Sequence, residues 1–565
     1  MKKSGKILGV LLAVCMVITM NVVSAYADSS VPVTRWDNYA ATKFAGGTGT
    51  KDDPYRIENG EQLAKLAKDV SARNTHKGEY FRLEKNVDLS AHRWIPIGDF
   101  GGSSYKSFEG FLDGNCKTIS GMVVDQSKDQ QSAGLLGYIS NATKGNEVGV
   151  KDLTIANAAL YVDESILADP KRGFVSAGIL VAGAIVSDGY KGTGVFENIS
   201  VSGTITVKAT KGSNKIGGLI GEDNRCIVRN CATDVTITGA SNTGGMTGIS
   251  GTTTFENCTA KGRISGLWGL GGFVGYASSS NWDDKTTEST FTNCIADVAI
   301  EASDWNVGGF VGLAEFGTFK NSASFGTVTS TVTRWEPRVG GFVGCAGDTE
   351  NYKNSTVTLV KCHSASLVTC DRKDTCGGFA GKFEAGTTAG CSFDNQKNTN
   401  LNGIGTNKTE QQVEACITQK NLSNICEDVY GGHYYAEELT VDQEATCSEE
   451  GSKSYHCIRC DAKGKSFVIP KINLTHVDAK AATAESAGNI EYWHCEKCGK
   501  YFSDAKAAHE ITLEQTVIEK LPGKEAVNNL PKTGDDSRVA LWLLLLAVSG
   551  GALLKNLADR RKNAD

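Results

Sequence analysis

Hydrophobic residues follow different patterns in different parts of this chain of 565 residues. Long apolar runs occupy both ends, from Ile7 to Met20 and from Val539 to Leu554. Between them, short apolar groups alternate with polar positions and are framed by glycines, of which there are 65 against only 8 prolines. Such alternation is typical of short β-strands joined by tight turns, because successive strand side chains point to opposite faces. The pattern therefore predicts a mainly β region between two apolar ends.

The N-terminal apolar run has the flanks of a secretory signal peptide. Lysines precede it, and the small residues Ala25 and Ala27 follow it in the spacing that a signal peptidase cleaves. The run is short for a membrane span, and nothing after Ala27 prolongs it. We therefore predict that residues 1–27 are a signal peptide and that the secreted chain begins at Asp28.

The C-terminal apolar run precedes a basic tail. The run carries no charge up to Lys555, whose ammonium can reach the membrane surface, so we predict a transmembrane helix over residues 539–558. The positive-inside rule places a basic cluster that follows such a helix in the cytoplasm. That cluster consists of Arg560, Arg561 and Lys562. The residues before the helix are then expected outside the cell.

A short motif stands just before this helix, Leu530-Pro531-Lys532-Thr533-Gly534. Motif, helix and basic tail, over residues 530–565, resemble in this order the LPXTG sorting signal of Gram-positive cell-wall proteins. The resemblance implies a sortase as partner, cleavage between Thr533 and Gly534, and an amide bond from Thr533 to peptidoglycan. It implies a secreted protein anchored in the cell wall, whose precursor spans the membrane. The alternative is a single-pass membrane protein in which the motif is incidental.

A glycine-framed motif recurs through the middle of the chain with spacings of 27, 27, 37, 32 and 37 residues. Each copy has two glycines, two further residues that are mostly apolar, and a third glycine. The copies are Gly217-Gly-Leu-Ile-Gly221, Gly244-Gly-Met-Thr-Gly248, Gly271-Gly-Phe-Val-Gly275, Gly308-Gly-Phe-Val-Gly312, Gly340-Gly-Phe-Val-Gly344 and Gly377-Gly-Phe-Ala-Gly381. Short strands repeated at this period, without a helix between them, predict the rungs of a parallel β-solenoid.

An asparagine recurs with the same period and predicts a ladder. Equivalent side chains of a solenoid stack about 4.8 Å apart, so a column of amides can pass hydrogen bonds along its axis. The candidate column is Asn198, Asn230, Asn257, Asn293 and Asn321. The next position holds Ile199, Cys231, Cys258, Cys294 and Ser322, which we expect to point inward, the cysteines as buried thiols rather than as disulfides.

These units resemble the GLUG repeats of bacterial surface proteins, and residues 46–400 resemble the repeat region together with the segment that commonly precedes it. Within that segment Asn59 is expected to cap a helix, with Gln62 at the third helical position. The helix would bury one face and cover the open end of the solenoid. That face comprises Leu63, Leu66, Ala67 and Val70. We assign residues 28–45 to a linker and 401–432 to a connecting segment.

Two related Cys/His modules follow, over residues 433–475 and 476–520, and a spacer over 521–529 leads to the sorting signal. Each module has a Cys-x-x-Cys pair and resembles a short tandem repeat found near the anchors of Firmicutes surface proteins. The ligand sets could hold a structural Zn²⁺, because closed tetrahedral sets of cysteine and histidine suit that ion. The first set is His433, Cys447, Cys457 and Cys460, and the second is His476, Cys495 and Cys498, with His494 or His509 as a further ligand. Disulfides are the alternative in a secreted chain.

Charge and cysteine content limit the function classes. The net charge is −6, and removing the +3 of the signal peptide and the +1 of residues 534–565 leaves −10. An acidic surface repels nucleic acid, so no nucleic-acid partner is expected. Of the 18 cysteines, Cys15 belongs to the signal peptide, and the odd remainder requires at least one free, metal-bound or intermolecular thiol.

No catalytic motif stands out. His509-Glu510 begins a zinc-peptidase motif, but Leu513 occupies the place of its second histidine. We therefore expect no enzyme and predict an adhesin-like or structural display protein, which either has a glycan or host-protein ligand or is a stalk without a ligand of its own. Loop tryptophans would suit such a ligand where they are exposed and would only close their loops where they are buried, and the candidates are Trp268, Trp282, Trp305 and Trp335. The alternative is a surface glycan hydrolase that uses clustered carboxylates, with Asp234, Asp297 and Asp304 as candidates.

Overall fold

The structure is a computed structural model, and its described residues form two compact units. One unit ends at Cys416, and the other is built from residues 435–457 and 463–521. The described residues are 31–99, 106–126, 132–140, 147–163, 175–186, 193–208, 214–279, 288–331, 336–350, 354–416, 435–457 and 462–521.

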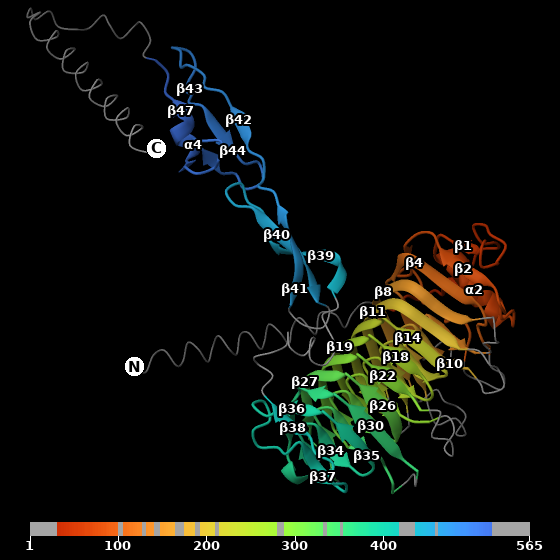
Figure 1. The fold of residues 1–565 in the computed structure, drawn as a ribbon. Helices are drawn as coiled ribbons and strands as arrows, with labels where there is room; N and C mark the ends of the chain where they lie inside the picture. Colours follow the sequence, from red (N-terminus) through yellow and green to blue (C-terminus); the bar gives the residue numbers. More distant parts are fainter. Residues whose placement is uncertain are drawn as a thin grey trace, which may run out of the picture. The chain divides into compact units, whose positions relative to one another are not determined.

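The first unit begins with a short 3-10 helix, η1 (Trp36–Tyr39), and the helix α2 (Gly60–Ser71), which lies at the N-terminal end of the stack (Figure 1). As predicted, Asn59 caps α2, and its side chain accepts a hydrogen bond from the Gln62 backbone N–H at 3.0 Å. The Gln62 side chain reaches back to the Glu58 N–H at 2.7 Å. The predicted apolar face is buried: Leu63, Leu66, Ala67 and Val70.

The strands of this unit run parallel in register and form three long sheets, which confirms a mainly β fold of stacked parallel strands, as in a β-solenoid. The described strands of the largest sheet are β1 (Tyr55–Ile57), β2 (Tyr80–Leu83), β3 (Val87–Asp88), β4 (Phe111–Ser120), β5 (Val123–Asp125), β8 (Val148–Asp163), β11 (Gly194–Lys208), β14 (Cys226–Arg229), β15 (Ala232–Ala240), β18 (Thr254–Glu256), β19 (Thr259–Gly266), β22 (Thr290–Thr292), β23 (Ile295–Ala302), β26 (Phe316–Lys320), β27 (Ala323–Ser330), β30 (Thr356–Val360), β31 (His363–Ser364), β32 (Leu367–Cys370), β35 (Gly386–Ala389), β36 (Ser392–Asp394) and β38 (Glu414–Cys416).

The other two sheets hold the strands on either side of the glycine motif. One contains β6 (Ser132–Ala133), β9 (Ser176–Gly178), β12 (Lys215–Gly217), β16 (Thr243–Gly244), β20 (Leu270–Gly271), β24 (Val307–Gly308), β28 (Val339–Gly340) and β33 (Cys376–Gly377). The other contains β7 (Leu136–Ile139), β10 (Val181–Ile185), β13 (Ile220–Asn224), β17 (Thr247–Ser250), β21 (Val274–Ala277), β25 (Val311–Ala314), β29 (Val343–Ala346), β34 (Ala380–Phe383) and β37 (Ile404–Asn407). One rung thus runs, for example, through β18, β19, β20 and β21.

The predicted asparagine ladder is present from Asn198 to Asn293, and Asn321 does not extend it, because Asn293 Oδ1 is buried without a hydrogen-bond partner. Asn230 donates from Nδ2 to Asn198 Oδ1 at 3.1 Å, Asn257 to Asn230 at 3.4 Å, and Asn293 to Asn257 at 3.2 Å. Each of these asparagines has a positive φ between 52° and 56°, the left-handed region that asparagine tolerates better than most residues. The asparagine therefore both turns the chain between two strands and bonds to the next rung.

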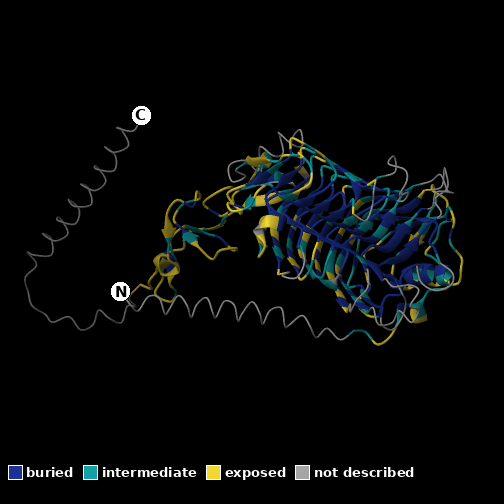
Figure 2. Cartoon of the chain, turned by 90° about the horizontal axis from the view of Figure 1, so that it is seen from below, coloured by how far each residue is buried: buried dark blue, intermediate teal, exposed yellow. Residues whose placement is uncertain are grey.

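Phenylalanines form two parallel stacks inside the rungs. Phe255, Phe291 and Phe319 stack at 5.0 and 4.7 Å between ring centroids. The second stack runs through the glycine motif, with centroids 4.8 to 5.1 Å apart, and meets the first edge to face. It consists of Phe273, Phe310, Phe342 and Phe379. Buried residues accordingly line the inside of the stack (Figure 2).

The glycines of the motif allow close approach of backbone at the corner between two sheets. A Cβ on Gly271 would lie 1.9 Å from the carbonyl oxygen of Val274, and a Cβ on Gly217 would lie 1.8 Å from that of Ile220. Real Cβ atoms do not approach oxygen so closely, so no other residue fits this corner. The recurrence of the motif therefore follows from the shape of the rung.

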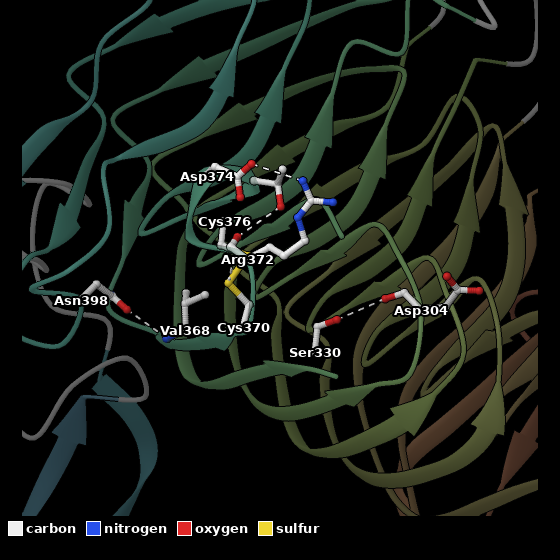
Figure 3. The surroundings of a disulfide bond; sticks show 9 residues. Asp304, Ser330, Val368, Cys370, Arg372, Asp374, Cys376 and Asn398 are labelled. Atoms are coloured by element: carbon white, nitrogen blue, oxygen red, sulfur yellow. Dashed lines mark hydrogen bonds and ion pairs between the residues drawn. A yellow bond between two sulfur atoms is a disulfide. The ribbon is translucent and has the colours of Figure 1, made fainter. Parts of the chain in front are cut away.

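The cysteines beside the asparagine ladder point inward as free thiols, as expected. Cys231, Cys258 and Cys294 are each at most 1% exposed. A disulfide that the sequence analysis did not anticipate joins Cys370, at the end of β32, to Cys376, at the start of β33 (Figure 3). It closes a turn that contains the 3-10 helix η3 (Lys373–Thr375).

The second unit consists of small antiparallel sheets. The first sheet is β39 (Tyr435–Gln443), β40 (Gly451–Cys457) and β41 (Lys463–Ile469). The next is β42 (Thr475–Val477), β44 (Tyr492–His494), β45 (Tyr501–Phe502) and β46 (Glu510–Ile511). The last pairs β43 (Gly488–Asn489) with β47 (Val517–Ile518), beside the helix α4 (Leu513–Thr516). Among the described residues no helix is both long and apolar enough to cross a bilayer, and the predicted segment 539–558 lies outside them.

Candidate functional site

Several predicted sites lie outside the described residues. These are the signal-peptidase positions Ala25 and Ala27, the sorting motif Leu530, Pro531, Lys532, Thr533 and Gly534, and the candidate ligands His433 and Cys460. Of Cys457, the structure describes the backbone position at the end of β40. These assignments remain predictions from the sequence.

The structure brings three of the predicted metal ligands together, but across the two modules. Cys447, in the turn between β39 and β40, meets Cys495 and Cys498, in the turn after β44, with all three sulfurs within 4.8 Å of one another. The Cys447 and Cys498 sulfurs are 3.5 Å apart. Cys447 is 5% exposed, Cys495 is fully buried, and Cys498 is exposed. The sequence analysis had placed Cys447 in a different ligand set from the other two.

The histidines proposed for the second set lie elsewhere. His476 places its Nε2 2.9 Å from a Glu491 carboxylate oxygen and stacks on Trp493. His509 is largely exposed and lies 3.2 Å from Asp504. His494 stacks on Tyr501, and its Nδ1 is buried without a hydrogen-bond partner. None of the three belongs to the cysteine group.

A cluster of charged side chains lies near the C-terminal end of the stack. Carboxylate oxygens of Asp348 and Glu384, which are buried, and of Glu350, which is exposed, lie within 4.8 Å of one another. Two lysines pair with Glu350 and Glu384. Lys382, on β34 and only 2% exposed, pairs with Glu384 and lies 3.4 Å from Glu350, and Lys408 lies 2.9 Å from Glu350 and 3.1 Å from Glu384.

The two lysines set the ionisation of this cluster. Burial alone would raise the pKa of Glu384, but hydrogen bonds from Lys382, Thr349 and Lys408 outweigh it and lower the pKa to about 2. The pKa of Glu350 is also lowered, first by its hydrogen bond from Lys408 and then by the charge of Lys382. Both carboxylates are therefore ionised at neutral pH, and neither is suited to act as a general acid.

The carboxylates proposed for glycan cleavage do not converge. Asp234 and Asp297 are both exposed on the largest sheet, but the rung between them places Lys261 in the same column. Asp304 follows the end of β23, and the five strand residues after Asp297 alone span about 16 Å. The Asp304 pKa is raised by burial. The three carboxylates therefore lie apart and do not form the pair that glycan cleavage requires.

Two of the four predicted loop tryptophans are described, and they occupy equivalent positions on adjacent rungs. Gly269 N–H donates to the Trp305 carbonyl at 3.1 Å, and Asn242 N–H donates to the Trp268 carbonyl at 3.0 Å. Trp305 is 38% exposed, and the guanidinium of Arg338 lies 5.3 Å from its ring centroid. Arg338 is itself buried, at 7% exposure, so the accessible part of this turn surface is defined by Trp268 and Trp305. Trp282 and Trp335 lie outside the described residues.

Comparison with known proteins identifies a GLUG motif at residues 303–329, which cover the loop of Trp305 and most of β27. Halomucin of Haloquadratum walsbyi is 28% identical over 194 residues, 33% of this chain and 2% of that protein. A putative Gly-rich membrane protein of Evansella cellulosilytica is 30% identical over 164 residues, 28% of this chain and 15% of that protein. The chain thus spans only a small part of these relatives.

Two solved structures resemble part of the chain. One is a putative immunoglobulin A1 protease from Bacteroides ovatus, with a TM-score of 0.36 and 20% identity, covering 51% of this chain and 80% of that one. The other, an IgA1 protease, has a TM-score of 0.30 and 13% identity, covering 61% of this chain and 21% of that one. TM-scores this low support no inference about activity.

Proposed function

We propose that this chain is a surface protein of a Gram-positive bacterium, secreted, anchored covalently to peptidoglycan through Thr533, and built to display a β-solenoid. The observation that carries the proposal is the order of its parts along the sequence: a predicted signal peptide, the stacked parallel strands from β1 to β38, the Cys/His modules, and a predicted sorting signal. The GLUG motif and the similarity to a protein described as a Gly-rich membrane protein support a surface location.

For its molecular role we propose ligand binding by an adhesin-like surface, with the turn surface of Trp268 and Trp305 as the contact area. An exposed indole offers a flat apolar face that stacks on sugar rings or on side chains of a host protein. The position of the two tryptophans on adjacent rungs supports this role, because the stack holds both of them on a rigid backbone. The ligand is then a glycan or a host-matrix protein.

This role is tested with arrays of glycans and host-matrix proteins probed by the secreted chain. We expect at least one ligand whose binding weakens by about fivefold or more in Trp305→Ala, because loss of one aromatic contact costs about 1–3 kcal/mol. Tyr39→Ala is the matched control, since Tyr39 is 46% exposed at the N-terminal end of the stack. Clean negatives on both arrays, or equal losses in both variants, would refute the adhesin-like role.

The alternative is a surface glycan hydrolase, and the observation that favours it is the convergence of Asp348, Glu350 and Glu384. The lysines that neutralise this cluster weigh against it, because an inverting or retaining glycosidase needs one protonated carboxyl. Release of reducing sugars from purified glycans would establish the hydrolase, provided that Glu350→Gln abolishes the release.

A further inference from the structure

The cysteine group at the junction of the two modules is assembled from distant parts of the chain. Cys447 and Cys498 are separated by 51 residues, yet their sulfurs are 3.5 Å apart. An apolar shell surrounds the group, consisting of Phe502, Ala507, Ile472, Leu474 and Trp493. Two segments are thus held together with their thiols facing one another.

The turn that carries Cys495 and Cys498 has the backbone of a metal-binding knuckle. Gly499 N–H donates to the Cys495 carbonyl at 2.8 Å, and Cys495 N–H donates to the Lys500 carbonyl at 2.9 Å. Backbone N–H groups of Lys497 and Cys498 also point at the Cys495 sulfur. Gly499 has a φ of +69°, and no atom lies within 4 Å of an added Cβ, so backbone conformation rather than space requires glycine there.

The partner segment is fixed in a similar way. Thr446 N–H donates to the Glu449 carbonyl at 2.9 Å, closing the turn that presents Cys447. The Thr446 carbonyl accepts from Ile472 N–H at 3.0 Å, which ties this turn to the segment leading into the second module. Both sides of the cysteine group are therefore positioned by backbone hydrogen bonds.

We propose that Cys447, Cys495 and Cys498 bind one Zn²⁺ ion that links the two modules, with the fourth ligand supplied by solvent or an exogenous donor beside the exposed Cys498. Tetrahedral Zn²⁺ with bonds of about 2.3 Å places its sulfur ligands about 3.8 Å apart. The 3.5 Å separation of Cys447 and Cys498 is close to this value, whereas a disulfide has its sulfurs about 2.05 Å apart. Binding releases the thiol protons to solvent.

This assignment explains an asymmetry between the modules. The position that corresponds to Cys447 in the second module is Ala484, so the second knuckle has no third cysteine of its own. Cys447 of the first module supplies it. A cysteine in one repeat thus completes the site of the next repeat, and the metal acts as a cross-link between them.

The test measures Co²⁺ binding to the full chain, purified with reductant and freed of metal, by the thiolate-to-cobalt absorption band. We expect Cys447→Ser and Cys495→Ser each to lose the same one equivalent of Co²⁺, although they lie in different modules. Cys116→Ser, which removes an exposed free thiol of the solenoid, should keep it. If Cys447→Ser retains full binding while Cys495→Ser loses it, the cross-module site is refuted.

A second measurement uses the unaltered chain and does not depend on the folding of a variant. Zn²⁺ added to the reduced protein should protect Cys447, Cys495 and Cys498 from alkylation at least tenfold, as mapped by peptide mass spectrometry. Cys116 should react equally with and without Zn²⁺. Equal alkylation of the three cysteines in both samples would overturn the proposal.

Discussion

Replacement of Asn257 tests whether the asparagine ladder stabilises the solenoid in the way that its geometry indicates. Asn257 has a φ of +55°, donates to Asn230 at 3.4 Å and accepts from Asn293 at 3.2 Å. Asn257→Ala removes both hydrogen bonds, each worth about 0.5–1.5 kcal/mol, and places alanine in a left-handed conformation that costs about 1 kcal/mol more. We expect a loss of about 2–4 kcal/mol. Asn257→Gly keeps the conformation available and should lose only about 1–3 kcal/mol.

The assay is native-state hydrogen exchange of peptides from β18 and β19, because a solenoid opens locally rather than all at once. Exchange in the alanine variant should accelerate about 30- to 900-fold, and in the glycine variant about 5- to 150-fold. Lys361 is the matched control, since it occupies the equivalent left-handed position, with a φ of +51°, in a later rung. Lys361→Gly should slow exchange around β30. Equal acceleration of exchange in Asn257→Ala and Asn257→Gly would refute the claim that the left-handed conformation penalises alanine. No acceleration in either variant would refute the claim that the asparagine hydrogen bonds stabilise the stack.

Three further predictions concern packing and pH. Phe310→Ala should destabilise its rungs by about 3–5 kcal/mol, measured by the same exchange assay, because the ring is fully buried between two stacked neighbours. Gly271→Ala should expose the rung to limited proteolysis at native temperature, because its Cβ would lie 1.9 Å from the Val274 carbonyl oxygen. Burial lowers the pKa of His363 to about 4, so the folded chain binds fewer protons than the unfolded chain between pH 4 and about 6.5, and stability should fall as the pH drops through this window. The His363→Gln variant should show a flatter dependence in urea titrations. Burial raises the pKa of Asp223 to about 6, so this residue changes stability with pH in the opposite direction. Its contribution is the same in the natural chain and in His363→Gln, and it therefore cancels when the two are compared.

The sequence predicted the repeating architecture well, because stacking repeats the same physical demand in every rung. The glycine motif, the inward cysteines and the asparagine column all recur with the period of the rungs. What the spacing did not show is that the asparagine position is left-handed. Lys361 and Gly390 have positive φ at equivalent positions, and the search for asparagine missed them.

The contacts that the sequence analysis missed do not repeat. Among the rungs that the structure describes, Lys382 is buried with Glu384 in a single rung, and the disulfide of Cys370 with Cys376 closes a single turn. Similarity between the two modules suggested a self-contained ligand set in each, whereas the structure combines residues of both. The sequence did contain a sign of the shared site. Ala484 occupies the position of the third cysteine in the second module, so any third cysteine ligand of that module must come from another part of the chain.

The central claim is covalent attachment of the displayed solenoid to the cell wall, and it is tested by replacing Thr533. Purified walls are boiled in detergent, and the protein that stays with the peptidoglycan is quantified for the natural chain, for Thr533→Ala and for the control Thr516→Ala, which lies in α4 outside the motif. The proposal predicts that the natural chain and the control remain bound and that Thr533→Ala passes almost entirely into the detergent or the medium. Equal retention of Thr533→Ala and the natural chain would contradict it.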